Sequence, residues 1–251
     1  MSSNVLNKIK LIGDQSKINE LLEAIRCDDG VLGSIDFQKI LPMPESLDIE
    51  DGSISFWAIK SYLKAVSPDT EDFGVEKFDE ETFGRVIKEL NELHRNHYPI
   101  SVIMETDLSA PNAAEDIKQG KIYIDNFLKY GALTWYDWRT DNWGTKWNAY
   151  YCEEVYDNTI EFTTVYSKPT GIIYKLAEMF PEIRFNCAWA DEPLGINVGK
   201  MAITKDWMFS IHIPEDESKE AYEMSAEILG INLEERGYYY DDEAGTYIYK
   251  R

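Results

Sequence analysis

Four tryptophans lie within a short segment of this chain, with basic and amide side chains between them. Indole faces stack on planar ligands and sugars, and tryptophan and arginine contribute most of the binding energy at many protein interfaces. The segment therefore predicts a recognition surface. Its candidate ligand-binding residues are Trp135, Trp138, Arg139, Asn142, Trp143, Lys146 and Trp147. With Asp137 added, the polar members of the segment could also line the pocket of an enzyme.

A structural role explains the same tryptophans. Truncating a buried tryptophan costs about 3–5 kcal/mol, so indoles are valuable in a core. In that interpretation, which the burial argument favours, Arg139 and Lys146 pair with Asp137, Asp141 or backbone carbonyls. An intermediate arrangement buries two rings and leaves two at the rim of a cleft.

The other candidate motifs are incomplete. His94 and His97 form an H-x-x-H pair, but a zinc protease would also need the general-base Glu of H-E-x-x-H. We interpret the pair as solvated histidines near the negative end of a helix. The run from Gly195 to Lys200 resembles a phosphate loop, but it is one residue short, and Met201 stands where Ser or Thr must bind magnesium. We expect no cofactor, no metal site and no catalytic residues.

The charge of the chain limits its partners. It has 46 acidic and 25 basic residues, a formal net charge of -21. Such a surface repels nucleic-acid phosphates and anionic membranes. We therefore expect a protein partner or a small molecule, with no direct nucleic acid and no membrane. Residues 206–243 are so acidic that they offer an alternative, in which the chain mimics DNA and occupies a DNA-binding enzyme of the host.

The cysteines and the amino terminus favour a reducing compartment. Cys27, Cys152 and Cys187 are odd in number and far apart, unlike a disulfide framework or a zinc site. The first residues have no apolar core of the kind that a signal peptide needs. No stretch of 18 or more apolar residues occurs. A cytoplasmic location is expected.

Hydrophobic periodicity places the elements that must position the tryptophan segment. Strands are predicted at 7–13, 35–39, 159–166, 183–190 and 198–204, and a hairpin around 241–245. Helices are predicted from about 16, over 53–66, from 79, over about 112–130, over 170–180 and over 216–229. A short helix capped by Thr134 and ended by Gly144 carries the first tryptophans.

Two β-α-β pieces joined by a helical insertion can form one ferredoxin-like antiparallel sheet of split β-α-β units. The predicted class is therefore α+β. We expect residues 1–251 to form a single composite domain, with the helical insert at about 53–130. The ferredoxin-like core takes about 5–42 and 150–205, and an acidic helix and hairpin occupy 206–251.

Two segments carry a family resemblance: LTWYDWRTDNWGTKWNAY at 133–150 and FQKILPMPESL at 37–47. They resemble the YubB ferredoxin-like family of plasmid-, phage- and integrative-element-borne proteins. The resemblance implies a ferredoxin-like fold and a mobile-element context, but no activity. Our hypothesis is a mobile-element accessory protein that binds without catalysis through the tryptophan segment. The alternatives are the acidic DNA mimic and an enzyme with a tryptophan-lined pocket.

Overall fold

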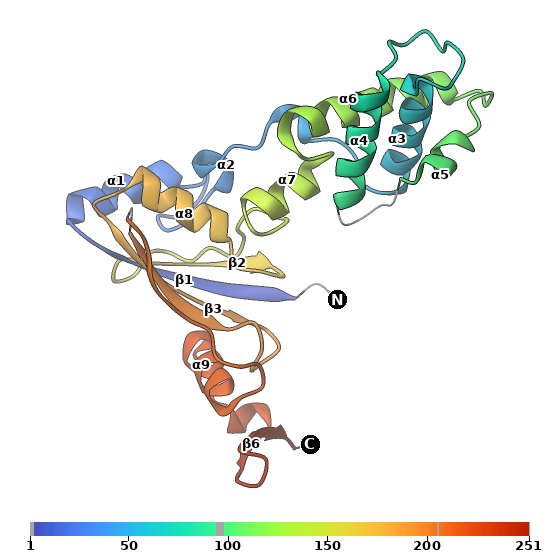
Figure 1. The fold of residues 1–251 in the computed structure, drawn as a ribbon. Helices are drawn as coiled ribbons and strands as arrows, with labels where there is room; N and C mark the ends of the chain where they lie inside the picture. Colours follow the sequence, from blue (N-terminus) through green and yellow to red (C-terminus); the bar gives the residue numbers. More distant parts are fainter. Residues whose placement is uncertain (1–2, 94–97, 205, 251) are drawn as a thin grey trace. The chain divides into compact units, whose positions relative to one another are not determined.

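The computed structural model describes residues 3–93, 98–204 and 206–250, and the chain falls into two compact units (Figure 1). The sheet unit comprises Met1–Pro42 and Arg139–Arg251, and the helical unit comprises Met43–Trp138. The second boundary falls inside helix α7 (Trp135–Asn142). His94 and His97 lie outside the described residues, so the prediction about them is not addressed.

The sheet unit contains a five-stranded sheet with the order β2-β1-β3-β4-β5, in which all neighbouring strands are antiparallel. The strands are β1 (Asn4–Ile12), β2 (Thr159–Val165), β3 (Arg184–Asp191), β4 (Gly199–Thr204) and β5 (Trp207–His212). Because β2 and β3 both run antiparallel to β1, they are parallel to each other. Helix α8 (Thr170–Met179) connects them, which makes a split β-α-β unit around β1. The predicted α+β class and ferredoxin-like sheet are confirmed.

The two faces of this sheet are covered differently. Along β1 the buried residues alternate at Val5, Asn7 and Ile9, as a strand with one core-facing side requires. Figure 1 shows α1 (Gln15–Ile25) and α8 on one side of the sheet and α9 (Lys219–Leu229) on the other. Helix α9 packs against Ala188 and Ala190 of β3. The predicted acidic helix is therefore part of the sheet unit.

The strand predicted at 35–39 is wrong, because this segment forms the short helix α2 (Phe37–Ile40). The side chain of Asp36 accepts a hydrogen bond from the Gln38 amide (2.9 Å) and caps the helix. Phe37 and Ile40 then lie one turn apart, and both are buried. A strand would bury Ile35 and Phe37 on one side, and a helix buries Phe37 and Ile40. Burial alone therefore does not decide between the two, and the capping carboxylate of Asp36 favours the helix.

The rest of the sheet unit is small. It includes a 3-10 turn (Glu234–Arg236) and a two-stranded hairpin of β6 (Tyr238–Asp241) and β7 (Thr246–Tyr249). The hairpin confirms the turn expected around 241–245. Aromatic contacts join it to α9, since the ring centroids of Tyr222 and Tyr238 are 5.3 Å apart.

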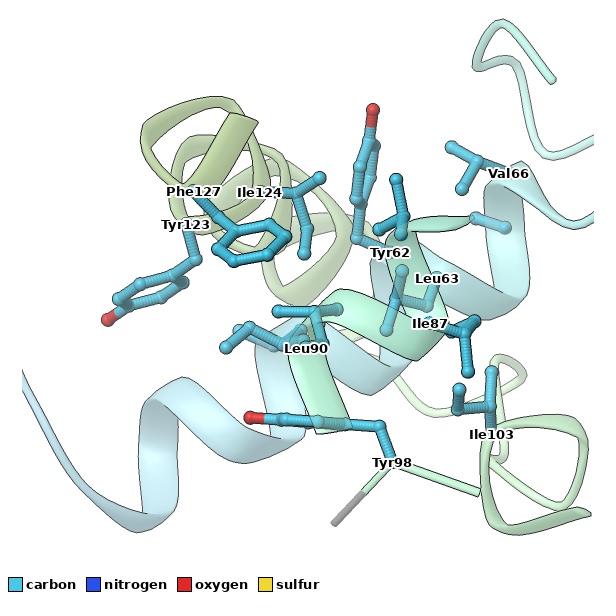
Figure 2. Close-up of a cluster of buried hydrophobic side chains, with 14 of the residues drawn as sticks. Tyr62, Leu63, Val66, Ile87, Leu90, Tyr98, Ile103, Tyr123, Ile124 and Phe127 are labelled. Carbon is cyan, nitrogen blue, oxygen red and sulfur yellow. The ribbon is translucent and has the colours of Figure 1, made fainter. Parts of the chain in front are cut away.

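The helical unit consists of α3 (Ser53–Val66), α4 (Glu80–Glu92), α5 (Ile100–Met104), α6 (Ala113–Tyr130) and a 3-10 turn (Glu45–Leu47). Its core is formed by side chains of α3, α4 and α6 with Tyr98 and Ile103, as Figure 2 shows. A Cβ atom on Gly120 of α6 would lie 2.1 Å from the Ala58 carbonyl oxygen of α3, so these two helices touch through the glycine. The unit includes the predicted insert at 53–130. The single composite domain of 1–251 stays a prediction.

Candidate functional site

Trp143 is part of the core of the sheet unit. It is 1% exposed, and its indole Nε1 donates to the Leu41 carbonyl oxygen (2.8 Å). Its ring meets the edge of Phe37 at a centroid distance of 5.6 Å. The Arg139 guanidinium lies 4.9 Å from the same indole. These contacts make Trp143 part of the packing of the sheet unit.

The first two tryptophans belong to the helical unit. Trp138 is buried and Trp135 is half-buried, with its ring 5.6 Å from that of Tyr136. Thr134 caps the helix as predicted, because its Oγ1 accepts from the Tyr136 amide (3.3 Å). The Asp137 carboxylate accepts from the Leu133 amide (3.3 Å), one residue before the cap.

Asp137 also lines a cavity of the helical unit, together with Asp51, Ser55 and Tyr98. The volume of this cavity is about 20 Å³, which is enough for roughly one water molecule. It is far smaller than the roughly 300–1,000 Å³ of a small-molecule pocket. The arrangement favours a structural role for Asp137 over one in a substrate pocket.

Lys146 and Trp147 lie in a different environment. The Trp147 side chain is 43% exposed, and Tyr166, which follows β2, is 49% exposed. The Lys146 Nζ lies 4.6 Å from the Tyr166 ring centroid and 5.5 Å from that of Trp147. We call Lys146, Trp147 and Tyr166 the Lys146 surface. It presents two large rings and one ammonium group to solvent.

Hydrogen bonds fix the two segments that carry this surface. The buried Thr145 hydroxyl donates to the Val165 carbonyl oxygen (2.9 Å), and the Ser167 hydroxyl donates to the Gly144 carbonyl oxygen. Tyr166 has a φ of 67°, in the left-handed region that non-glycine residues rarely adopt. Residues 144–147 and 165–167 therefore lie side by side, and their side chains are held at the same end of the sheet.

Asn197 supports Tyr166 from the loop that follows β3. Its amide Nδ2 donates to the Tyr166 carbonyl oxygen and to the Asp191 carboxylate, both at 3.1 Å. Asp191 is buried, and it also accepts from the Ser3 hydroxyl and from the Glu192 amide. This network holds the backbone of Tyr166 in its unusual conformation.

A second lysine lies beside the surface. Lys168 is half-buried, and its Nζ lies 4.2 Å from the ring centroid of the buried Trp189. Burial lowers the pKa of the Lys168 ammonium from its usual value. A Cβ atom on Gly199 would lie 2.4 Å from the Trp189 ring, so the glycine makes room for the indole.

The predicted site is thus divided. Trp143 and Arg139 pack in the sheet unit, Trp135 and Trp138 lie in the helical unit, and Lys146 and Trp147 reach solvent. Asn142 is half-buried beside the start of α8, where its carbonyl oxygen would lie 1.8 Å from a Cβ on Gly171. The ligand-binding role of the seven residues stays a prediction.

Sequence reasoning missed three residues at this place: Tyr166, Lys168 and Trp189. Tyr166 ends a clean strand pattern, and a lysine two residues later precedes a proline and the helix. That signal marks a strand-to-helix connection. It does not show that the connection meets residues 144–147, because that proximity depends on long-range pairing.

Within the described ranges, no group of three or more His, Cys, Asp or Glu side chains could hold a metal ion. None of the helices described is long and apolar enough to cross a membrane. The three cysteines are free thiols. Burial raises the pKa of the thiols of Cys152 and Cys187.

Fold and site together define an α+β protein with a ferredoxin-like sheet and an exposed aromatic and lysine surface at one end of it. Residues 146–232 match a family model described as the ferredoxin-like domain in Api92-like protein. This region contains Lys146, Trp147, Tyr166 and Lys168. The chain therefore contains a ferredoxin-like domain similar to that of Api92-like proteins.

Among solved structures, the crystal structure of a protein api92 from Yersinia pseudotuberculosis is similar to this chain at 10% sequence identity and a TM-score of 0.40. The match covers 86% of this chain and 99% of that chain. No curated protein matches the chain. These matches name neither a YubB family nor a mobile element.

Proposed function

We propose that this chain is a non-enzymatic binding protein of the cytoplasm that contacts its ligand through the Lys146 surface. The observation that carries the proposal is the exposure of Trp147 and Tyr166, whereas Trp143, four residues before Trp147, is buried. Tryptophan and tyrosine combine a large apolar area with a polar group, so such rings are typical of binding sites. The mobile-element context implied by the family resemblance is part of the same proposal.

The polar residues of the tryptophan segment favour binding over catalysis. Asp137 accepts from a backbone amide and lines a cavity that fits about one water. Arg139 stacks on Trp143. These contacts serve packing, which leaves Lys146 as the charged group at the exposed rings.

The test is to purify the tagged full-length chain from its host and to identify retained proteins and small molecules by mass spectrometry. The Trp147→Ala/Tyr166→Ala double variant should lose a retained species by at least about 10-fold, since a central aromatic contact contributes about 2 kcal/mol or more. Trp57→Ala is the matched control, because Trp57 is 56% exposed and lies on α3 of the helical unit.

Recovery of the same species at the same level from all three proteins would overturn the proposal. A substrate turnover abolished by Arg139→Ala or Asn142→Ala, with the fold intact, would replace it with the enzyme hypothesis. Circular dichroism of each variant keeps loss of folding distinct from loss of binding.

The acidic inhibitor remains the second candidate because of α9. Glu220, Glu223 and Glu227 lie on the exposed side of this helix, opposite the residues that pack on β3. Each carboxylate has a basic neighbour, however: His212 at 2.7 Å, Lys219 at 3.8 Å and Lys200 at 2.7 Å, respectively. The two lysine contacts reduce the negative potential that a DNA mimic needs.

This candidate makes its own prediction. A complex with a DNA-binding enzyme should weaken steeply with salt, and Glu220→Gln/Glu223→Gln/Glu227→Gln should weaken it while the Trp147→Ala/Tyr166→Ala variant should not. A complex that is weakened by Trp147→Ala/Tyr166→Ala and not by the triple glutamine variant would instead be formed through the Lys146 surface.

A further inference from the structure

Among the residues that the structure describes, the ammonium group of Lys168 has no acidic partner, although the chain is rich in acids. No carboxylate of the described residues lies within ion-pair distance of Lys168 or of Lys146. Other lysines of the sheet unit do have such partners, for example Lys8 with Glu161 at 3.1 Å. Partial burial therefore leaves the Lys168 charge less hydrated and uncompensated by a carboxylate.

Lys146 and Lys168 come from neighbouring segments. Lys146 Nζ lies over the ring of Tyr166, and Lys168 follows Tyr166 by two residues. The Ser167 hydroxyl, between them in sequence, is bonded to the Gly144 carbonyl oxygen. The positive end of α8 begins at Thr170, which adds to the local positive potential. The segments that carry these two cationic side chains and the two exposed rings thus lie side by side.

The net charge of -21 does not oppose a small anion here. At physiological ionic strength, charges more than about 8 Å away are largely screened, whereas an oxyanion in contact with an ammonium group is attracted strongly. A polyanion would extend beyond the two lysines and meet the acidic surface. The charge pattern therefore selects a ligand with one anionic group.

We propose that Lys146 and Lys168 bind the phosphate or carboxylate group of a small ligand whose flat ring stacks on Trp147 or Tyr166. This inference rests on the proposed binding function and names the chemical class of the ligand. The rings supply stacking area and the lysines supply charge-assisted hydrogen bonds. The Lys168 Nζ itself lies 4.2 Å from the ring centroid of the buried Trp189.

The experiment is isothermal titration calorimetry of the full-length chain with four probes: phenyl phosphate, benzoate, inorganic phosphate and phenol. The aromatic anions should bind at least about 10-fold more tightly than the ring or the anion alone, because they use both parts of the site. Comparison of phenyl phosphate with benzoate shows which oxyanion the site prefers.

Variants separate charge from packing. Lys168→Met and Lys146→Met should each weaken the preferred aromatic anion by at least about 10-fold, whereas Lys168→Arg, which keeps the charge, should bind more tightly than Lys168→Met. Lys175→Met is the matched control: Lys175 lies on α8 and pairs with Glu178 at 3.0 Å. Its removal should leave binding unchanged. Circular dichroism and thermal unfolding confirm that each variant is folded.

The inference is overturned if the aromatic anions bind no more tightly than inorganic phosphate, or if Lys168→Met binds as the wild type does. Loss of a retained partner in Trp147→Ala/Tyr166→Ala without any binding of these probes would leave the proposed function standing and this ligand class wrong. If the probes bind in a way that depends on Lys168, but Trp147→Ala/Tyr166→Ala retains the partner as the wild type does, the anion site is supported and the proposed function is wrong.

Discussion

Trp143 and Trp147 lie four residues apart, and their surroundings are opposite. Trp143 is enclosed by Phe37, Leu41 and Arg139, with its indole N–H bonded to a backbone carbonyl. Trp147 is 43% exposed and has the Lys146 ammonium over its ring. Composition alone does not separate a structural indole from a binding one. Trp143 is buried because it packs against Phe37 of α2 and Leu41, whereas Trp147 lies beyond these contacts and is exposed.

The largest effect is expected from Trp143→Ala. Removing this buried indole should lower the free energy of unfolding by about 3–5 kcal/mol, because it leaves a cavity beside Phe37 and an unpaired carbonyl on Leu41. Trp147→Ala, the control, should change it by less than about 1 kcal/mol, since an exposed ring loses little packing. Urea unfolding followed by circular dichroism measures both. Equal losses in the two variants would remove the distinction between the two tryptophans.

Gly171→Ala tests how closely the backbone at Asn142, just before the buried Trp143, packs against α8. A Cβ atom there would lie 1.8 Å from the Asn142 carbonyl oxygen, so the backbone before Trp143 must move. We expect a loss of about 1–3 kcal/mol, measured by calorimetry. Gly84→Ala in α4 is the opposite case, because nothing lies within 4 Å of its Cβ position. The free energy of unfolding of Gly84→Ala should rise by about 0.5–1 kcal/mol because of helix propensity. A Gly171→Ala variant as stable as the wild type would contradict the close packing of Gly171 against Asn142.

The reactivity of Cys187 provides a second way to compare Trp143→Ala with Trp147→Ala. It is buried on β3, and burial raises the pKa of its thiol, which keeps the reactive thiolate scarce. Iodoacetamide should therefore label Cys187 of the native chain much more slowly than Cys187 of the chain unfolded in urea. Trp143→Ala should accelerate this labelling, and Trp147→Ala should not. Rapid labelling of Cys187 in the native wild type would mean that the sheet unit opens readily.

The smallest effect concerns Lys168 and pH. Burial lowers the pKa of Lys168 in the folded chain below the value of 10.5 for an unperturbed lysine. Between the lowered pKa and 10.5 the unfolded chain binds more protons, so this group makes the free energy of unfolding rise with pH. Below that window both states are protonated and the contribution is constant.

Lys168→Met removes this dependence. The difference in free energy of unfolding between wild type and Lys168→Met should shift in favour of the wild type as the pH rises towards 10.5. Urea unfolding at several pH values measures the difference, with Lys175→Met as the control for loss of an exposed charge. A difference that stays constant, or that shifts towards the variant, would show that Lys168 is not destabilised by burial.

Much of the secondary structure could be predicted because its signals are local. Asp79 caps α4 through the Thr82 amide (2.7 Å), and Gly131 ends α6 at a φ of 70°. Helix α3 covers the predicted 53–66. The wrong strand prediction at 35–39 has a local cause as well: Asp36 fits the polar half of a strand alternation in the sequence, but its side chain caps a helix.

The candidate site could be predicted only in part. The sequence identified Lys146 and Trp147, but it grouped them with Trp138 and Trp143, which are buried. It missed Tyr166 and its neighbour Lys168, because their place beside residues 144–147 depends on hydrogen bonds between segments that are about twenty residues apart.

The sequence by itself determined the α+β class, the ferredoxin-like sheet and most helix limits, since periodicity, caps and glycine positions act over a few residues. Tertiary structure decided which tryptophans are enclosed and which lysines lack an acidic neighbour. Burial and charge pairing depend on the whole packed unit, so one indole became core beside Phe37 and another stayed exposed beside Lys146.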